Sequence, residues 1–221
     1  MKKALTVTFA LCLAALCGCG SSGSASEAPG SSAADASSVQ TPEASSSAEV
    51  KYEPCTKRGS VYESKMTNLR FTLPEGYDFV SDETLLGLTK QNYTSVEEMV
   101  SLDKHIMDAA ALKEESIPKI TFQFSNKNTN GLNESYTTKE IAEMSQKSQA
   151  EKRPTGEMKA FTLDDGNEYM YFTASEKIDE ERTLYNTNVL RMLGKYTFLM
   201  QYTSFDDDFE TAILPCFESL S

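Results

Sequence analysis

The sequence predicts an α+β domain in which a twisted antiparallel β-sheet of about six strands is packed by helices. Two observations support this fold class. Segments in which apolar and polar residues alternate come in pairs joined by tight-turn sequences, as in antiparallel hairpins. Capping sequences followed by apolar residues at helical spacing lie before and after these pairs, an order typical of α+β proteins. We expect one domain over residues 50–221, a length that can bury a sizeable core.

The first predicted elements of this domain are two short strands. Residues 60–64 form the first strand and residues 68–73 the second. In the second strand Leu69, Phe71 and Leu73 alternate with polar residues, as expected of a strand with one buried face. A Pro-Glu-Gly sequence follows directly and ends the strand.

Two helices are predicted next. Ser81 begins a helix that we expect to reach Lys90. Thr94 and Ser95 each start a capping box, in which a hydroxyl residue is followed three positions later by glutamate. Apolar residues at helical spacing follow these caps, so we expect the second helix to continue to Ala110.

A strand and a third helix complete the first half of the domain. Pro118 opens a strand that carries three apolar side chains on one face: Ile120, Phe122 and Phe124. Residues 126–135 are polar and are expected to form a loop. Thr137 then begins a helix, and Glu140 completes its capping box.

The second half of the domain is predicted to be mostly antiparallel sheet. Residues 159–163 and 168–174 flank an Asp-Asp-Gly-Asn turn, and residues 183–192 and 196–203 flank a Leu-Gly-Lys turn. The last segment is expected to form a helix that Pro215 kinks or shortens. Its apolar residues at helical spacing are Phe209, Ile213, Phe217 and Leu220.

The N-terminus has the pattern of an export signal. Lys2 and Lys3 give a short positive segment, and residues 4–16 follow without a charge. Such a stretch suits the apolar region of a signal peptide, which typically has about 7–15 residues. It is shorter than the roughly 20 residues that a membrane-spanning helix needs.

The sequence Leu16-Cys17-Gly18-Cys19 resembles the lipobox of bacterial lipoproteins. The resemblance implies that Cys19 receives a diacylglyceryl group and that cleavage follows Gly18, so that residues 1–18 are a lipoprotein signal peptide. Cys17 stands where Ala or Ser is commoner in that family. Two acyl chains are about what stable anchoring requires.

Residues 19–49 are predicted to be the lipidated cysteine and a disordered tether. Residues 20–49 include 11 Ser and 7 Ala, and Val39 is their only large apolar side chain. Such a segment cannot bury enough apolar surface to offset the entropy lost on ordering. The composition is similar to that of Gram-positive surface lipoproteins, in which the tether lifts the domain away from the membrane.

The chain is acidic, with a formal net charge of −12 at pH 7. Removal of the signal peptide would take away Lys2 and Lys3 and leave −14. This balance argues against a nucleic-acid partner, which would draw on basic patches, and against close association with anionic lipid. It is compatible with a cationic partner, with calcium or simply with solubility.

Two cysteines remain in the predicted domain, Cys55 and Cys216, near its two ends. An exported location permits a disulfide between them, which would stabilise the domain by about 4–5 kcal/mol in the chain-entropy model. Free thiols are the alternative, and the sequence leaves both open. The pair forms neither a CxxC redox motif nor a zinc knuckle.

The domain also resembles the small bacterial lipoproteins with a PsbP-like domain. The stretch from Asn68 to Tyr77, the strand over residues 119–124 and the closing hairpin with the last amphipathic segment carry the resemblance, which spans about residues 59–220. It implies an α-β-α sandwich around an antiparallel sheet. It implies no activity, because a fold does not fix a function.

No catalytic constellation can be read from the sequence. His105 is the only histidine, which excludes HExxH and multi-histidine zinc sites, and no GxSxG elbow or P-loop occurs. We expect His105 on the polar side of the second helix. We predict no catalytic residue and no cofactor.

Three acidic clusters remain as candidates for general acid–base chemistry: Asp164-Asp165, Asp179-Glu180-Glu181 and Asp206-Asp207-Asp208. Turn and loop chemistry explains the first two more simply, and a helix N-terminus explains the third. Asp206, Asp207 and Asp208 are also a weak calcium candidate, because they lack the alternate spacing that lets carboxylates converge on one ion.

The sequence therefore predicts a lipoprotein anchored by its lipid to the extracytoplasmic face of the cell membrane. We expect a non-catalytic binding or accessory module whose partner is a surface protein or a wall polymer. A carboxylate-dependent glycan hydrolase and a small solute-binding receptor are the alternatives. Tyr169, Tyr171 and Phe172 form an aromatic strand that is either an exposed binding face or part of a sheet covered by helices on both faces; we favour the covered sheet.

Overall fold

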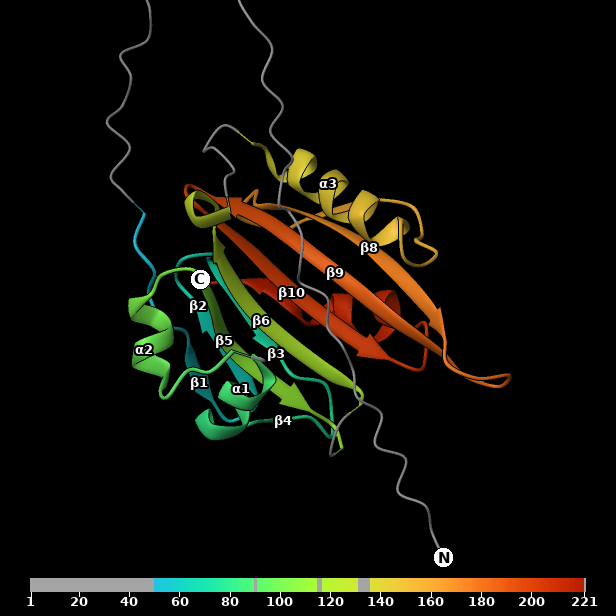
Figure 1. The fold of residues 1–221 in the computed structure, drawn as a ribbon, viewed down its shortest axis with the longest axis horizontal. Coiled ribbons are helices and arrows are strands. Elements are labelled where there is room, and N and C mark those ends of the chain that lie inside the picture. Colours follow the sequence, from blue (N-terminus) through green and yellow to red (C-terminus); the bar gives the residue numbers. More distant parts are fainter. Residues whose placement is uncertain (1–49, 90, 115–116, 131–135, 221) are drawn as a thin grey trace, which may run out of the picture. The chain divides into compact units, whose positions relative to one another are not determined.

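The computed structural model describes residues 50–89, 91–114, 117–130 and 136–220 (Figure 1). The strands are β1 (Thr56–Arg58), β2 (Val61–Ser64), β3 (Leu69–Thr72), β4 (Asp78–Phe79), β5 (His105–Leu112), β6 (Lys119–Asn126), β7 (Lys159–Thr162), β8 (Glu168–Lys177), β9 (Thr183–Leu193), β10 (Tyr196–Ser204) and β11 (Phe217–Ser219). The helices are α1 (Asp82–Leu88), α2 (Val96–Ser101), α3 (Thr138–Ala150) and the short η1 (Lys127–Asn130), η2 (Phe209–Ile213) and η3 (Leu214–Cys216).

The strands form two antiparallel sheets rather than one. The larger sheet has seven strands in the order β4-β5-β6-β10-β9-β8-β7, and the smaller has four in the order β1-β2-β3-β11. Pairing of β6 with β10 joins the two halves of the large sheet, although the two strands are far apart in sequence. The predicted α+β class with a central antiparallel sheet is confirmed.

The small sheet covers one face of the large sheet. Phe122 on β6 stacks on Tyr62 of β2, with ring centroids 4.0 Å apart, and meets Phe71 of β3 edge to face. Phe217 of β11 packs against Phe161 of β7 at 5.0 Å. The main hydrophobic core lies between the two sheets. We had expected helices to cover this face of the large sheet, but strands of the small sheet bury its aromatic side chains instead.

Helix α3 packs on the large sheet through a second, smaller core. Ile141 and Ala142 of α3 lie against Phe172 and Met170 of β8 and Leu190 of β9. Figure 1 shows α3 along β8 and β9. Helices α1 and α2 lie beside β5, toward the opposite edge of the sheet. The prediction of helical packing therefore holds for α3.

Local signals placed several elements correctly. Thr137 and Glu140 form a reciprocal capping box at the start of α3. The side chain of Ser95 caps α2, accepting from the Glu98 amide. In the β7–β8 turn Gly166 has a φ of 82°, a conformation that glycine adopts without strain.

The second predicted helix is too long. It ends at Ser101, and residues 105–112, which we expected to be helical, form β5 instead. Asp103 has a φ of 48° and turns the chain between the two elements. Residues 106–111 are buried on both faces of the strand. Apart from Asp108 these side chains are apolar, so the run shows no alternation and periodicity cannot distinguish it from a helix.

The predicted C-terminal helix is also wrong. The chain makes a π-turn at η2 and a 3₁₀ turn at η3, which contains Pro215, and then becomes strand β11. Phe217 pairs with Phe71 of β3, so the end of the chain completes the small sheet. Proline cannot donate a helical hydrogen bond, and this explains why the helix stops.

The predicted signal peptide, the lipidated Cys19 and the tether lie outside the described residues, as do residues 131–135 of the predicted loop. Residues 127–130 of that loop form η1. Within the described part of the chain, no helix combines the length and apolar character needed to cross a bilayer.

Candidate functional site

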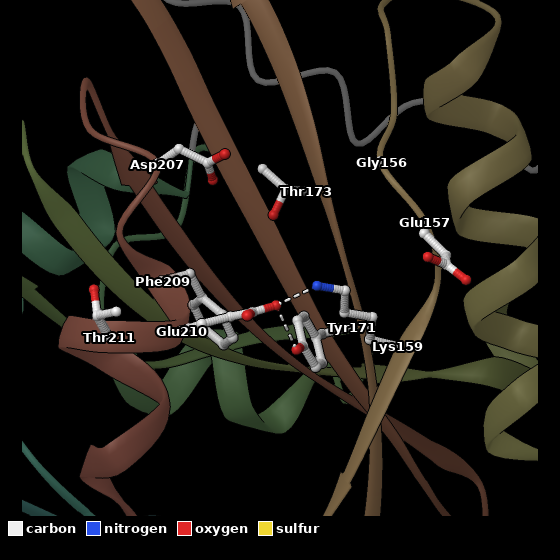
Figure 2. A pocket seen from close by; sticks show the side chains of 9 residues that line it. All are labelled: Gly156, Glu157, Lys159, Tyr171, Thr173, Asp207, Phe209, Glu210 and Thr211. Atoms are coloured by element: carbon white, nitrogen blue, oxygen red, sulfur yellow. Dashed lines mark hydrogen bonds and ion pairs between the residues drawn. The ribbon is translucent and has the colours of Figure 1, made fainter.

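A pocket of about 350 Å³ lies where η2 crosses the face of the β7–β8 hairpin (Figure 2). A volume of this size falls at the lower end of the range for small-ligand sites. The side chains that give the pocket its chemistry are Glu157, Lys159, Tyr171, Asp207, Phe209 and Glu210. Backbone at Gly156 and the side chains of Thr173 and Thr211 complete its walls.

The hairpin register positions one wall of the pocket. Lys159 on β7 pairs with Tyr171 on β8, so both side chains project from the same face of the sheet. The amide of Gly156 donates to the carbonyl of Thr173 at 2.7 Å and fixes the segment before β7 against β8. Phe209 of η2 packs against Tyr171, with ring centroids 5.1 Å apart, and anchors the opposite wall.

An exposed ion pair lies in the pocket. Lys159 Nζ donates to Glu210 Oε1 at 2.5 Å, and the Tyr171 hydroxyl donates to the same oxygen at 3.0 Å (Figure 2). The hydrogen bond and the opposite charge raise the pKa of Lys159, and the same contacts lower the pKa of Glu210. Burial, followed by the contact with Glu210, raises the pKa of the Tyr171 phenol. Lys159 and Glu210 are therefore both charged at neutral pH.

The remaining charges in the pocket are negative. Figure 2 shows Asp207 and Glu157 on opposite sides of it, and both residues are exposed. Three carboxylates face one ammonium group among the lining side chains. The lining thus has two more negative charges than positive ones.

The three consecutive aspartates are not gathered around one point in this structure. The carboxylate of Asp208 accepts from the Tyr202 hydroxyl at 2.8 Å, and the amide of Asp206 donates to Ser204. Only Asp207 lines the pocket. Among the described residues, no group of three or more His, Cys, Asp or Glu side chains lies close enough to hold a metal ion.

The other two acidic clusters serve turns. Asp165 accepts from Asn68 at 2.5 Å and from Asn167 within the β7–β8 turn. Asp179 accepts from the amide and side chain of Arg182 at the β8–β9 turn. Neither cluster lines the pocket.

The two thiols of the domain are free in this structure. Cys55 donates to the carbonyl of Asp108 at 3.5 Å, and Cys216 donates to the carbonyl of Ala212 at 3.4 Å. Each sulfur is thus directed at a different backbone group, and the disulfide considered from the sequence is not formed. Burial raises the pKa of both thiols, which makes them poor nucleophiles.

His105 lies on strand β5 and not on the polar side of a helix. Its Nδ1 is 2.9 Å from the hydroxyl of Ser125, its cross-strand neighbour on β6. Burial lowers the pKa of His105, and a contact with Gln123 opposes that shift. A serine nucleophile would also need a carboxylate to orient the imidazole. The contacts of His105 found in the described structure are with Ser125 and Gln123, which indicates a structural pair.

Asp108 is a buried carboxyl group that the sequence did not single out. It lies at a β-bulge in β5 and accepts from the hydroxyls of Tyr52 and Tyr62, the latter at 2.7 Å, and from the amide of Cys55 at 3.1 Å. Burial raises its pKa, while these donors oppose the shift. Its donors enclose it, so we interpret Asp108 as the anchor of residues 52–55.

The pocket itself could not be found from the sequence. The predicted hairpin does bring Lys159 and Tyr171 to neighbouring strands. No local pattern indicates that the segment carrying Glu210 crosses these two strands. We expected that segment to form a helix.

Comparisons with known proteins give little beyond the course of the chain. No family model matches the chain, and no curated protein matches it. The chain is similar to a solved structure, the solution structure of cyanobacterial PsbP (CyanoP) from Synechocystis sp. PCC 6803. The two are 11% identical with a TM-score of 0.38, and the match covers 80% of this chain and 98% of that one. At this identity and TM-score the likeness supplies no family, ligand or activity for this chain.

Proposed function

We propose that the protein is a membrane-anchored extracytoplasmic lipoprotein whose domain is a non-catalytic binding module. The observation that carries the binding role is the pocket between β7–β8 and η2, with its charged and aromatic lining. The lipobox at residues 16–19 supports the anchor, and the Ser- and Ala-rich residues 20–49 support a tether between the anchor and the domain.

The protonation states of Lys159 and Glu210 favour binding over catalysis. A glycosidase-type acid needs a carboxyl group with a raised pKa, whereas contacts with Lys159 and Tyr171 lower the pKa of Glu210. A lysine base needs a lowered pKa, whereas Glu210 raises that of Lys159. Asp108 has a raised pKa, but it is buried among its donors and does not line the pocket.

The anchor is tested by replacing the cysteine that would carry the lipid. We expect wild-type protein expressed in a bacterial host to incorporate labelled palmitate and to sediment with membranes. Cys19→Ser should abolish the label, because serine has no thiol to alkylate, whereas the neighbouring Cys17→Ser is the matched control and should remain labelled. Labelling of the Cys19→Ser protein would contradict the assignment.

The binding role is tested by cross-linking in intact cells with the full-length protein. A photo-reactive amino acid at Thr211, which is exposed at the edge of the pocket, should capture a surface protein or a wall polymer. The same amino acid at the exposed Glu180, outside the pocket, is the control. Equal capture at both positions, or none at Thr211, would count against the pocket. Turnover in a panel of glycans would favour the hydrolase instead.

A further inference from the structure

We infer that the pocket between β7–β8 and η2 binds a small organic cation, a ligand that carries one or more ammonium groups on an alkyl chain. This inference rests on the proposed binding role and adds the chemical class of the ligand.

The charge of the lining gives the sign of the ligand. Lys159 and Glu210 form an exposed ion pair at 2.5 Å, and Glu157 and Asp207 add two further exposed carboxylates on opposite sides of the pocket. A cationic group entering this space meets two negative charges, whereas an anion is repelled by both. The net negative charge of the whole chain acts in the same direction.

The described carboxylates of the pocket are not grouped as ligands around one point. No three acidic side chains of the described residues lie close enough to coordinate one ion. A cavity of about 350 Å³ instead leaves room for a molecule that reaches from one carboxylate toward the other. Tyr171 and Phe209 line this space only by the edges of their rings, because they are 7% and 3% exposed.

Lys159 already shows this mode of binding within the protein. It is an ammonium group on a four-carbon chain, and it lies in the pocket with Nζ on Glu210 Oε1. The Tyr171 hydroxyl donates to that same oxygen. An external alkylammonium ligand would repeat this arrangement at Glu157 or Asp207 and would compete with Lys159 for Glu210.

The first test compares three probes of equal chain length that differ in charge. The full mature chain in detergent is titrated with 1,5-diaminopentane, with 1,5-pentanediol and with glutarate, and the heat of binding is measured. We expect the diamine alone to bind, and its affinity to fall as salt is added. Binding of glutarate, equal binding of the diol, or absence of diamine binding would overturn the cation assignment.

The second test uses variants that separate ligand contacts from a structural role. Asp207→Asn and Glu157→Gln should each weaken diamine binding roughly two- to fivefold, the range for one exposed ion pair. Glu180→Gln removes the same charge outside the pocket and should leave the affinity unchanged. Lys159→Met should strengthen binding, because it removes an internal competitor and its positive charge.

A purely structural ion pair would give the opposite result for Lys159. If Lys159→Met leaves diamine affinity unchanged or lowers it while the protein remains folded by circular dichroism, the inference is wrong. The proposed binding role would survive that result if the Thr211 probe still captured a surface partner, so the two can fail separately.

Discussion

Asp108 is enclosed by donors from three other positions in the chain. The hydroxyls of Tyr52 and Tyr62 and the amide of Cys55 all point at its carboxylate. Removing the acceptor would leave three buried or half-buried donors without a partner, each at a cost of about 1–3 kcal/mol when no water replaces it.

We therefore expect Asp108→Ala to lower the free energy of unfolding by about 3 kcal/mol or more, measured by urea denaturation. Asp78→Ala is the matched control, since Asp78 is exposed on β4, and it should change stability by no more than about 0.5 kcal/mol. Similar losses in both variants would show that the donors around Asp108 contribute little.

The raised pKa of Asp108 also predicts a pH dependence. Burial disfavours the charged carboxylate, so the pKa of Asp108 in the folded state lies above its ordinary value of 3.8. This residue's contribution to stability should therefore fall as pH rises from 3.8 toward the folded pKa. Asp108→Asn cannot titrate and should remove that slope from a plot of unfolding free energy against pH.

His105 gives a second prediction, with the opposite slope. Burial lowers its folded pKa below 6.5, so the unfolded chain binds the proton more readily. The contribution of His105 to the free energy of unfolding should be fully present above pH 6.5 and should be lost as pH falls toward the folded pKa. Because the chain has one histidine, an NMR titration of the imidazole is unambiguous. A midpoint at or above 6.5 would contradict the burial of this ring.

At the scale of secondary-structure elements, the capping box of α3 is a local device that was readable from the sequence. The Thr137 side chain accepts from the Glu140 amide, and Glu140 accepts from the amide of Thr137 at 2.8 Å. Thr137→Ala should cost about 1 kcal/mol in a urea titration. Ser148→Ala inside the same helix is the control and should be neutral or slightly stabilising, because alanine is the better helix former.

Strand β11 is an element that the sequence did not predict, and it can be tested directly. Phe217 is buried and meets Phe71 at 4.9 Å and Phe161 at 5.0 Å. Phe217→Ala should lower the unfolding free energy by about 3–5 kcal/mol. Glu218→Ala, at an exposed position of the same strand, should have little effect. Equal effects would argue against the pairing of β11 with β3.

These elements show what sequence patterns could and could not supply. The caps at Ser95 and Thr137 and the glycine turn at Gly166 depend on contacts within a few residues, so they were predicted correctly. Strand β5 and the C-terminal strand depend on neighbours far along the chain. Their apolar residues fit both helical and strand spacing, and only the sheet decides between the two.

At the scale of the whole molecule, the α+β class was predictable, but the division into two sheets was not. The class depends on the order of local elements, whereas the small sheet needs β11 to return to β3. The same return positions η2 over β7 and β8 and so creates the pocket. The small sheet and the pocket were therefore missed for the same reason, because no local pattern showed that the C-terminal segment returns to β3.

The free thiols give a prediction for the folded domain as a whole. Since Cys55 and Cys216 are not bonded to each other, the urea midpoint should be the same with and without reductant. Thiol titration of the denatured domain, residues 50–221, should find two reactive groups. A lower midpoint in reductant together with no reactive thiol would show that the disulfide forms after all.

The place of β11 also determines when the protein can finish folding during its synthesis. The strands β1, β2 and β3 are made first among the elements of the domain, yet their sheet is completed by the last strand, Phe217–Ser219. The core between the two sheets therefore cannot close until residues 217–219 have been synthesised and have paired with β3. Until then Phe71 lacks its edge-to-face contact with Phe217, so folding of the first strands waits for the last one.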